Sequence, residues 1–405
     1  MRDEIKQLAD QIAPRLTVIR HQIHRHPELA FCEEQTAALV AGALGELGLR
    51  VQTGVGKTGV VGLLEGAGAT PRRGSLGSTS ARCFGIRVDM DALPIQEETG
   101  LPFASEVPGV MHACGHDCNT TMGLGAAMIL SQLRERLGGG VKFIFQPAEE
   151  GEGGAKAMIE DGVLEDPRMD GIVAAHVDAE LRVGTVGFKP GVALAAADQI
   201  RITVQGQGSH AAHPEQSHDP IVAAAHVILA LQTIASRRVG PAEPVVVTIG
   251  TIHAGQAPNV IPSQVRLLGT VRTRSEELRD RMPQLIEEVA SSAAAALGCT
   301  VELEYQRGAP PLKHDDELTE VAAQACRELL GEEQVRVEES KSMGAEDFAL
   351  FAQALPATQL AVGGVGEGQE KPIGHHPNFM VDEGCLPVGA AALAAVAVRF
   401  LAKES

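Results

Sequence analysis

Residues 141–151 read VKFIFQPAEEG, and this stretch decides how the chain folds. An apolar run typical of a β-strand ends here in a loop that carries two adjacent carboxylates, Glu149 and Glu150. A short buried strand that leads into such a polar loop is typical of open α/β sheets, whose sites form beyond the carboxyl ends of the strands. The stretch therefore predicts an α/β fold with a functional site at one edge of its sheet.

Two other predicted strands end in the same way. Residues 83–88 lead into Asp89 and Asp91, and residues 171–175 lead into His176. Because the carboxyl ends of parallel strands meet at one edge of a sheet, we expect these polar side chains to lie together.

A second loop, residues 112–117, reads HACGHD and adds metal-binding side chains. Cys114 and His116 can converge on one metal ion because Gly115 permits a tight bend. Residues 374–379, GHHPNF, supply a further histidine. Each motif by itself is more often structural, as a buried histidine, a solvated acidic pair or a turn. Together they favour a hydrolase with two divalent ions, in which a neighbouring carboxylate accepts the proton of the attacking water.

The order of the predicted elements divides the chain. Strands and helices alternate on both sides of residues 192–305, with helices expected at 3–24, 33–47, 119–136 and 384–402. We expect Asn119, Thr120 or Thr121 to cap the third helix, and residues 66–82 to form a surface loop. Residues 192–305 instead follow the β-α-β-β-α-β order of a ferredoxin-like domain. We therefore predict one discontinuous domain, 1–190 and 307–405, that is interrupted by an inserted α+β domain, 191–306.

Composition excludes several classes of partner. The 405-residue chain has a formal net charge of −18, which repels nucleic acid and anionic lipid. The N-terminus lacks the apolar core of a signal peptide, and no apolar run approaches the roughly 18 residues that span a bilayer. Seven cysteines without framework spacing fit a reducing compartment. We expect a cytoplasmic protein without a nucleic-acid or membrane partner.

Seven segments together resemble the M20 metallopeptidase family over nearly the whole chain. The similarity is greatest to its amidohydrolase branch, which contains hippurate hydrolases, N-acyl-amino-acid amidohydrolases and auxin-conjugate hydrolases. The segments are residues 87–94, 111–117, 146–151, 208–212, 259–262, 344–348 and 375–379. The resemblance implies a zinc-peptidase-like catalytic domain with a mainly parallel sheet, and an inserted ferredoxin-like dimerisation (lid) domain.

The resemblance also implies roles for residues of the catalytic domain. Glu149 matches the general base that activates the water, and Asp91 matches a carboxylate that orients a ligand. Two divalent ions per subunit are implied, zinc or manganese, with nickel or cobalt also possible. The implied metal ligands are Cys114, as the bridging thiolate, with His116, Glu150, His176 and His375.

In the inserted domain, three residues match positions with a role in related enzymes. His210 corresponds to a histidine that reaches the partner subunit's active site and stabilises the oxyanion. Asn259 and Arg272 match positions that bind the carboxylate end of the substrate. The resemblance therefore implies a homodimer that forms through the inserted domain.

We accordingly predict metal-dependent hydrolysis of the amide bond of small-molecule N-acyl amino acids by a metal-activated water. One alternative is a dipeptidase or carboxypeptidase of the same family, with the same site and mechanism. An alternative of another class is a non-catalytic, metal-binding dimeric scaffold. Assays with N-acyl amino acids and dipeptides distinguish these three readings.

Overall fold

The computed structural model describes residues 1–66, 82–338, 340 and 342–402. The surface loop expected at 66–82 therefore lies, apart from its two ends, outside the described residues. The chain divides into two compact units. The larger unit comprises Met1–Gly191, Lys313–Ser340 and Leu350–Ser405, and the inserted unit comprises Val192–Leu312 and Lys341–Ala349.

The larger unit is built on an eight-stranded sheet in the order β1-β2-β4-β3-β5-β16-β6-β15. Its central strands β4, β3, β5 and β16 are parallel to one another, whereas β1 with β2, β2 with β4 and β16 with β6 pair antiparallel. The central strands therefore place their carboxyl ends at one edge, as the sequence predicts. The strands are β1 (Arg50–Val55), β2 (Gly59–Leu64), β3 (Cys83–Asp89), β4 (Gly140–Gln146), β5 (Gly171–Arg182), β6 (Val186–Phe188), β15 (Val335–Val337) and β16 (Ala357–Val365).

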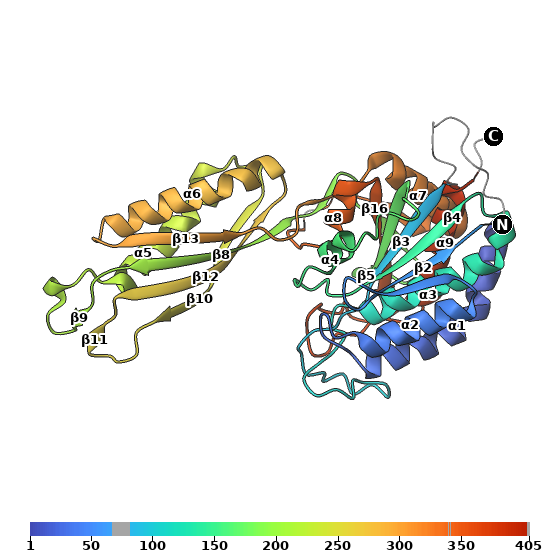
Figure 1. Cartoon of the computed structure of the whole chain (residues 1–405), viewed down its shortest axis with the longest axis horizontal. Coiled ribbons are helices and arrows are strands. Elements are labelled where there is room, and N and C mark those ends of the chain that lie inside the picture. The colour runs from blue at the N-terminus through green and yellow to red at the C-terminus, as the bar shows by residue number, and fades with distance from the viewer. Residues whose placement is uncertain (67–81, 339, 341, 403–405) are drawn as a thin grey trace. The chain divides into compact units, whose positions relative to one another are not determined.

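Helices pack beside this sheet, and α1, α2 and α3 are seen together in Figure 1. Every residue of α3 from His116 to Leu130 is buried, and an added Cβ on Gly123 would lie 2.7 Å from Val88 of β3. This helix is therefore enclosed between the sheet and other helices. The helices of this part are α1 (Arg2–Arg25), α2 (Glu34–Glu46), α3 (His116–Gln132), α4 (Gly154–Glu160), α7 (Asp316–Leu330), α8 (Ala349–Ala354) and α9 (Cys385–Phe400), with short turns at Arg134–Arg136 and Glu332–Gln334.

The start of α3 corrects one sequence prediction. The helix begins at His116, with Gly115 as its N-cap at a φ of 86°, so none of Asn119, Thr120 and Thr121 is the cap. The Asn119 Nδ2 donates to Asp89 Oδ1 at 2.7 Å, and the Thr120 hydroxyl donates to the Asp89 carbonyl at 2.6 Å. Because α3 is buried, these polar side chains bind the end of β3 instead of capping a helix. His116 consequently lies in the first turn of α3.

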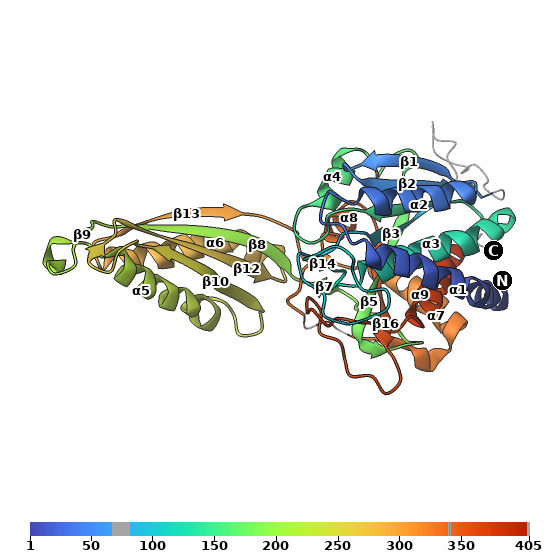
Figure 2. The same cartoon turned by 90° about the horizontal axis from the view of Figure 1, so that it is seen from below.

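The inserted unit has the predicted ferredoxin-like topology. Strands β8 (Ala196–Gln205), β10 (Val245–Ala254), β12 (Gln264–Thr273) and β13 (Thr300–Gln306) form an antiparallel sheet in the order β10-β12-β8-β13. Helices α5 (Pro220–Thr233) and α6 (Glu276–Ala295) share one apolar core with the sheet (Figures 1 and 2). The remaining short elements are β7 (Val192–Leu194), β9 (Ser209–His210), β11 (Val260–Ile261), β14 (Leu312–Lys313) and the turns Pro214–Gln216 and Ile234–Arg238.

One helical stretch corrects the expectation about apolar runs. Residues Pro220–Arg238 are long and apolar enough to cross a membrane by length and composition alone. Ala223, Val227 and Leu231 on this stretch are buried in the core of the inserted unit. About 33% of the stretch is buried, as expected of a helix that packs one face against a domain core.

Candidate metal centre

Five side chains of the larger unit converge beyond the carboxyl ends of its central strands. The ligand atoms of Cys114, His116 and His176 lie within 4.8 Å of one another, and so do those of Cys114, Glu150 and His375. The Cys114 sulfur belongs to both groups. A thiolate common to two sets of imidazole and carboxylate ligands suits a pair of ions that share one ligand.

The rings of His176 and His116 are oriented by contacts between their Nδ1 atoms and backbone carbonyl oxygens. The His176 Nδ1 lies 2.7 Å from the Val177 carbonyl, and its Nε2 faces the Cys114 sulfur at 3.6 Å. The His116 Nδ1 lies 2.9 Å from the Asp91 carbonyl, and its Nε2 is buried without a hydrogen-bond partner among the described residues. A buried nitrogen without a partner costs free energy, and an Nδ1–H that donates to a carbonyl leaves Nε2 as a metal ligand. The residues present therefore fit a metal.

The electrostatics of the cluster favour the ligand form of the cysteine. Burial by itself raises the pKa of the Cys114 thiol, but the neighbouring His116 and His176 imidazoles lower it to about 6. The thiolate is the form that binds metals. Opposite it, Glu150 Oε1 lies 3.3 Å from His375 Nε2.

Asp91 connects the two loops that carry these ligands. Its Oδ1 accepts the Glu149 N–H and its Oδ2 accepts the Glu150 N–H, both at 3.0 Å, while His116 Nδ1 lies 3.3 Å from Oδ1. Burial raises the pKa of this carboxyl, but the hydrogen bond and charge of His116, together with the Glu149 and Glu150 N–H groups, outweigh burial and lower it. Asp91 is therefore an ionised acceptor that aligns the Glu149–Glu150 backbone with the His116 ring.

Glu149 lies at the rim of this cluster. Its carboxylate is partly exposed and lies within 4.8 Å of the ligand atoms of His116 and Glu150. It is not part of either group that contains Cys114. A carboxylate beside the ligands, with access to solvent, has the position that a general base requires.

The contacts behind the HACGHD loop were not predicted from the sequence. Asp117 accepts hydrogen bonds from Arg20 Nε at 3.0 Å and from His24 Nδ1 at 2.8 Å, and all three side chains are buried. These bonds hold the end of the loop against α1. The available signal was an arginine and a histidine beside apolar positions Ile19 and Ile23 of an amphipathic helix.

The other three predicted site residues belong to the inserted unit. His210 is exposed on β9, which pairs with β11, and its Nδ1 accepts the Ala212 N–H at 3.1 Å. The neutral ring therefore carries its proton on Nε2, where it can donate. Asn259 is exposed, and the half-buried Arg272 guanidinium makes no hydrogen bond or salt bridge with any residue that the structure describes.

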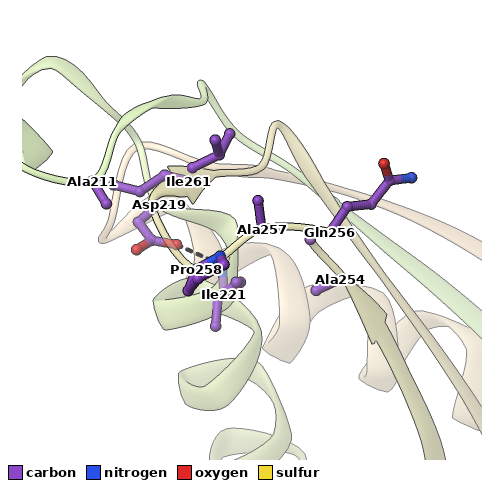
Figure 3. A pocket seen from close by; sticks show the side chains of 10 residues that line it. Ala211, Asp219, Ile221, Ala254, Gln256, Ala257, Pro258 and Ile261 are labelled. Atoms are coloured by element: carbon purple, nitrogen blue, oxygen red, sulfur yellow. Dashed lines mark hydrogen bonds between the residues drawn. The ribbon is translucent and has the colours of Figure 1, made fainter.

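A hollow of about 480 Å³ lies beside these loops in the inserted unit (Figure 3). Its lining includes the apolar side chains of Ala211, Ala257, Pro258 and Ile261 and the polar side chain of Gln256. The one charged side chain in the wall, Asp219, accepts the Ile221 N–H as the N-cap of α5. The hollow therefore offers space for a ligand near His210 and Asn259, and its lining residues supply no reactive group.

The fold and the cluster together define a class of metal-dependent hydrolase. Residues 85–399 match the model of peptidase family M20/M25/M40, and the chain belongs to this family. It is 39% identical to an N-acetylcysteine deacetylase of Bacillus subtilis, over 96% of this chain and 97% of that protein. It is 35% identical to thermostable carboxypeptidase 1 of Saccharolobus solfataricus, over 99% and 98% of the two chains.

A solved structure agrees in fold and in metal chemistry. The crystal structure of the Bacillus subtilis YXEP protein, described as a dinuclear metal-binding peptidase of the M20 family, matches with a TM-score of 0.81. Its sequence is 36% identical, and the match covers 97% of this chain and 99% of that one. This chain is accordingly a metal-dependent amidohydrolase or peptidase that acts on amide bonds, as the sequence predicted.

Proposed function

We propose that this enzyme hydrolyses the amide bond between an acyl group and the nitrogen of an amino acid with a free carboxylate. The observation that carries the proposal is Glu149 beside the two ligand groups that share Cys114. The relative named an N-acetylcysteine deacetylase supports a substrate of this class.

In this proposal, Cys114, His116, Glu150, His176 and His375 hold two divalent ions, of which zinc or manganese is expected, with nickel or cobalt as alternatives. When bound, such ions polarise the substrate carbonyl and acidify water. Glu149 accepts the proton of the attacking water and passes it to the leaving amine nitrogen. Asp91 keeps the Glu149 and Glu150 backbone in place during this transfer.

The inserted unit supplies the groups that recognise the substrate. The Arg272 guanidinium has no salt-bridge partner among the described residues, so it is available to bind the substrate carboxylate, together with Asn259. The Nε2–H of His210 donates to the oxyanion that forms when water adds to the carbonyl.

A panel of substrates tests the reaction class. N-acetyl amino acids, hippurate and dipeptides are assayed with and without a chelator, and the metal content of the same samples is measured. Chelator-sensitive cleavage of the N-acyl compounds, with about two metals per chain, is expected. Cleavage restricted to dipeptides would instead favour a dipeptidase or carboxypeptidase, the activity named for the Saccharolobus relative.

The role of Glu149 is tested by Glu149→Gln, which keeps the size of the side chain and removes its basicity. We expect kcat to fall by about 10²- to 10⁴-fold, with unchanged metal content and unchanged thermal stability. Retention of near wild-type turnover with full metal would refute the assignment.

We further propose a homodimer that forms through the inserted unit. Leu229 on α5 is 70% exposed and Ile252 on β10 is 59% exposed, and β10 is an edge strand of its sheet. An exposed apolar helix beside an open strand edge suits a second copy of the same surface. We expect Leu229→Asp to halve the mass measured by light scattering. The matched variant Val18→Asp, at a residue 64% exposed on α1, should leave the mass unchanged.

Mixing two inactive variants tests whether His210 acts in the partner subunit. A dimer of one Glu149→Gln chain and one His210→Ala chain retains one complete site only if His210 crosses to the partner. Random exchange then restores about a quarter of wild-type activity, because half of the dimers are mixed and each has one intact site. No recovery after verified exchange would place His210 in its own subunit's site.

A further inference from the structure

Three consecutive backbone N–H groups in the loop between β4 and α4 donate to buried carboxylates. Asp91 accepts two of them, from Glu149 and Glu150. The third, the Ala148 N–H, donates to Glu33 Oε1 at 2.9 Å. Two carboxylates from separate parts of the chain therefore hold the turn that presents Glu149.

Ala148 needs such support because of its backbone conformation. Its φ of 53° lies in the left-handed region, which is unfavourable for alanine. A conformation of this kind persists only where the surroundings impose it. Here the Ala148 N–H is held by Glu33, and its carbonyl accepts the Gly154 N–H at 3.0 Å. Loss of the Glu33 contact would release one of these two restraints.

The position of Glu33 is not explained by the helix that it precedes. Its side chain makes no capping hydrogen bond to α2, and Glu28 instead accepts the N–H groups of Gln35 and Thr36 at 3.0 and 2.9 Å. Glu33 is completely buried, and its second oxygen accepts the Thr58 hydroxyl at 2.5 Å. A buried carboxylate costs free energy unless its bonds compensate for it. Through its bond to Ala148, this carboxylate holds the backbone of the loop that carries Glu149.

We propose that Glu33 is a positioning residue for the hydrolytic reaction, which acts through the Ala148 backbone to fix the carboxylate of Glu149. The inference rests on the proposed role of Glu149 as general base. Asp91 restrains only the two residues that follow, so loss of Glu33 releases the N–H side of Ala148 and leaves its carbonyl held by the Gly154 N–H. Because Glu33 acts on the base and not on the substrate, its loss should lower kcat and leave KM nearly unchanged.

Three variants test this proposal in the metal-loaded enzyme. Glu33→Ala removes the acceptor and should lower kcat by on the order of 10- to 100-fold, because displacement of a catalytic group by about 1 Å has effects of this size. Glu33→Gln keeps an oxygen for Ala148 and should restore most of kcat. Glu28→Ala destabilises the start of the same helix without contact to Ala148, and its kcat should remain within about twofold of wild type.

Hydrogen exchange provides a measurement that does not depend on activity. Glu33→Ala should accelerate exchange of the amides in residues 147–151, whereas Glu28→Ala should accelerate exchange only near residues 34–37. If Glu33→Ala fails to fold, Glu33→Asp, which shortens the side chain by one methylene, should give the same pattern in milder form.

The outcomes separate this proposal from the proposed function. Equal losses of kcat in Glu33→Ala and Glu28→Ala, or unchanged exchange of residues 147–151 in the Glu33 variants, would overturn the role of Glu33. Altered exchange in an enzyme whose Glu149→Gln variant keeps full activity would instead leave the loop restraint standing and refute Glu149 as the base.

Discussion

The substitution Asp91→Asn tests whether one carboxylate aligns both metal-binding loops. In the wild-type protein, Asp91 accepts the N–H groups of Glu149 and Glu150 at 3.0 Å and lies 3.3 Å from the Nδ1 of His116. Asparagine has nearly the same shape but offers one acceptor oxygen. If that oxygen faces Glu149 and His116, the new NH₂ group faces the Glu150 N–H.

The size of the effect follows from these contacts. The Glu150 N–H loses its acceptor in a partly buried position, where an unsatisfied donor costs up to about 3 kcal/mol. The same substitution weakens the hydrogen bond that orients the His116 ring. Loss of such a supporting bond lowers metal affinity or activity by about 10- to 100-fold. We therefore expect weaker metal binding together with a moderate loss of stability.

Competition with a chelator measures this affinity for zinc and manganese, and denaturant unfolding measures stability. The control is Asp198→Asn in the inserted unit. Asp198 is a buried carboxylate that accepts the Gly308 N–H at 3.0 Å and pairs with Arg279 at 2.7 Å. Its loss should destabilise the protein without changing metal affinity. Wild-type metal affinity in Asp91→Asn, or an equal loss of affinity in Asp198→Asn, would refute the reasoning.

Two further predictions concern stability. Burial lowers the pKa of His24, but the Asp117 and Glu97 carboxylates together outweigh burial and raise it to about 9, against about 6.5 in the unfolded chain. Protonated His24 therefore stabilises the fold below pH 6.5, and this contribution of up to about 3 kcal/mol to the free energy of unfolding is lost as the pH rises to 9. Urea unfolding measured across this pH range should show the loss. A His24→Gln variant whose stability has the same pH slope would contradict the prediction. An added Cβ on Gly389 of α9 would lie 2.0 Å from Met122 Sδ, so Gly389→Ala should cost about 1–3 kcal/mol in thermal unfolding. Gly42→Ala on α2, where nothing lies within 4 Å, should be neutral or stabilising, and equal losses in both variants would show that crowding is not the cause.

Much of the fold could be predicted because local pattern and tertiary structure agree. Strand β4 ends at Gln146, one residue after the apolar run, and the β-α-β-β-α-β order of the inserted unit appears as a four-stranded antiparallel sheet. The start of α3 could not be predicted, because Asn119 and Thr120 have the composition of a helix cap. Because these side chains are buried against β3, they donate hydrogen bonds to Asp89 instead of accepting them from the start of the helix.

The candidate site divides in the same way. Cysteine, histidine and glutamate in short loops are recognisable as candidate metal ligands from their residue type. Cys114 and Glu150 could therefore be proposed as ligands from their motifs. Glu33 and Asp117 were not, because an acidic residue before a helix or in its first turn reads as an ordinary helix-terminal charge. Their contacts to Ala148 and to Arg20 join positions more than 90 residues apart.

The sequence by itself determined the class of chemistry, because ligand type and loop spacing restrict which metals and reactions are possible. It also determined the two kinds of sheet, because the order of predicted strands and helices along the chain differs between the inserted unit and the rest. Only the tertiary structure decided that Asp91 and Glu33 share the support of one turn. The physical reason is that hydrogen bonds between distant segments depend on how the sheet and helices pack, and no local pattern encodes them.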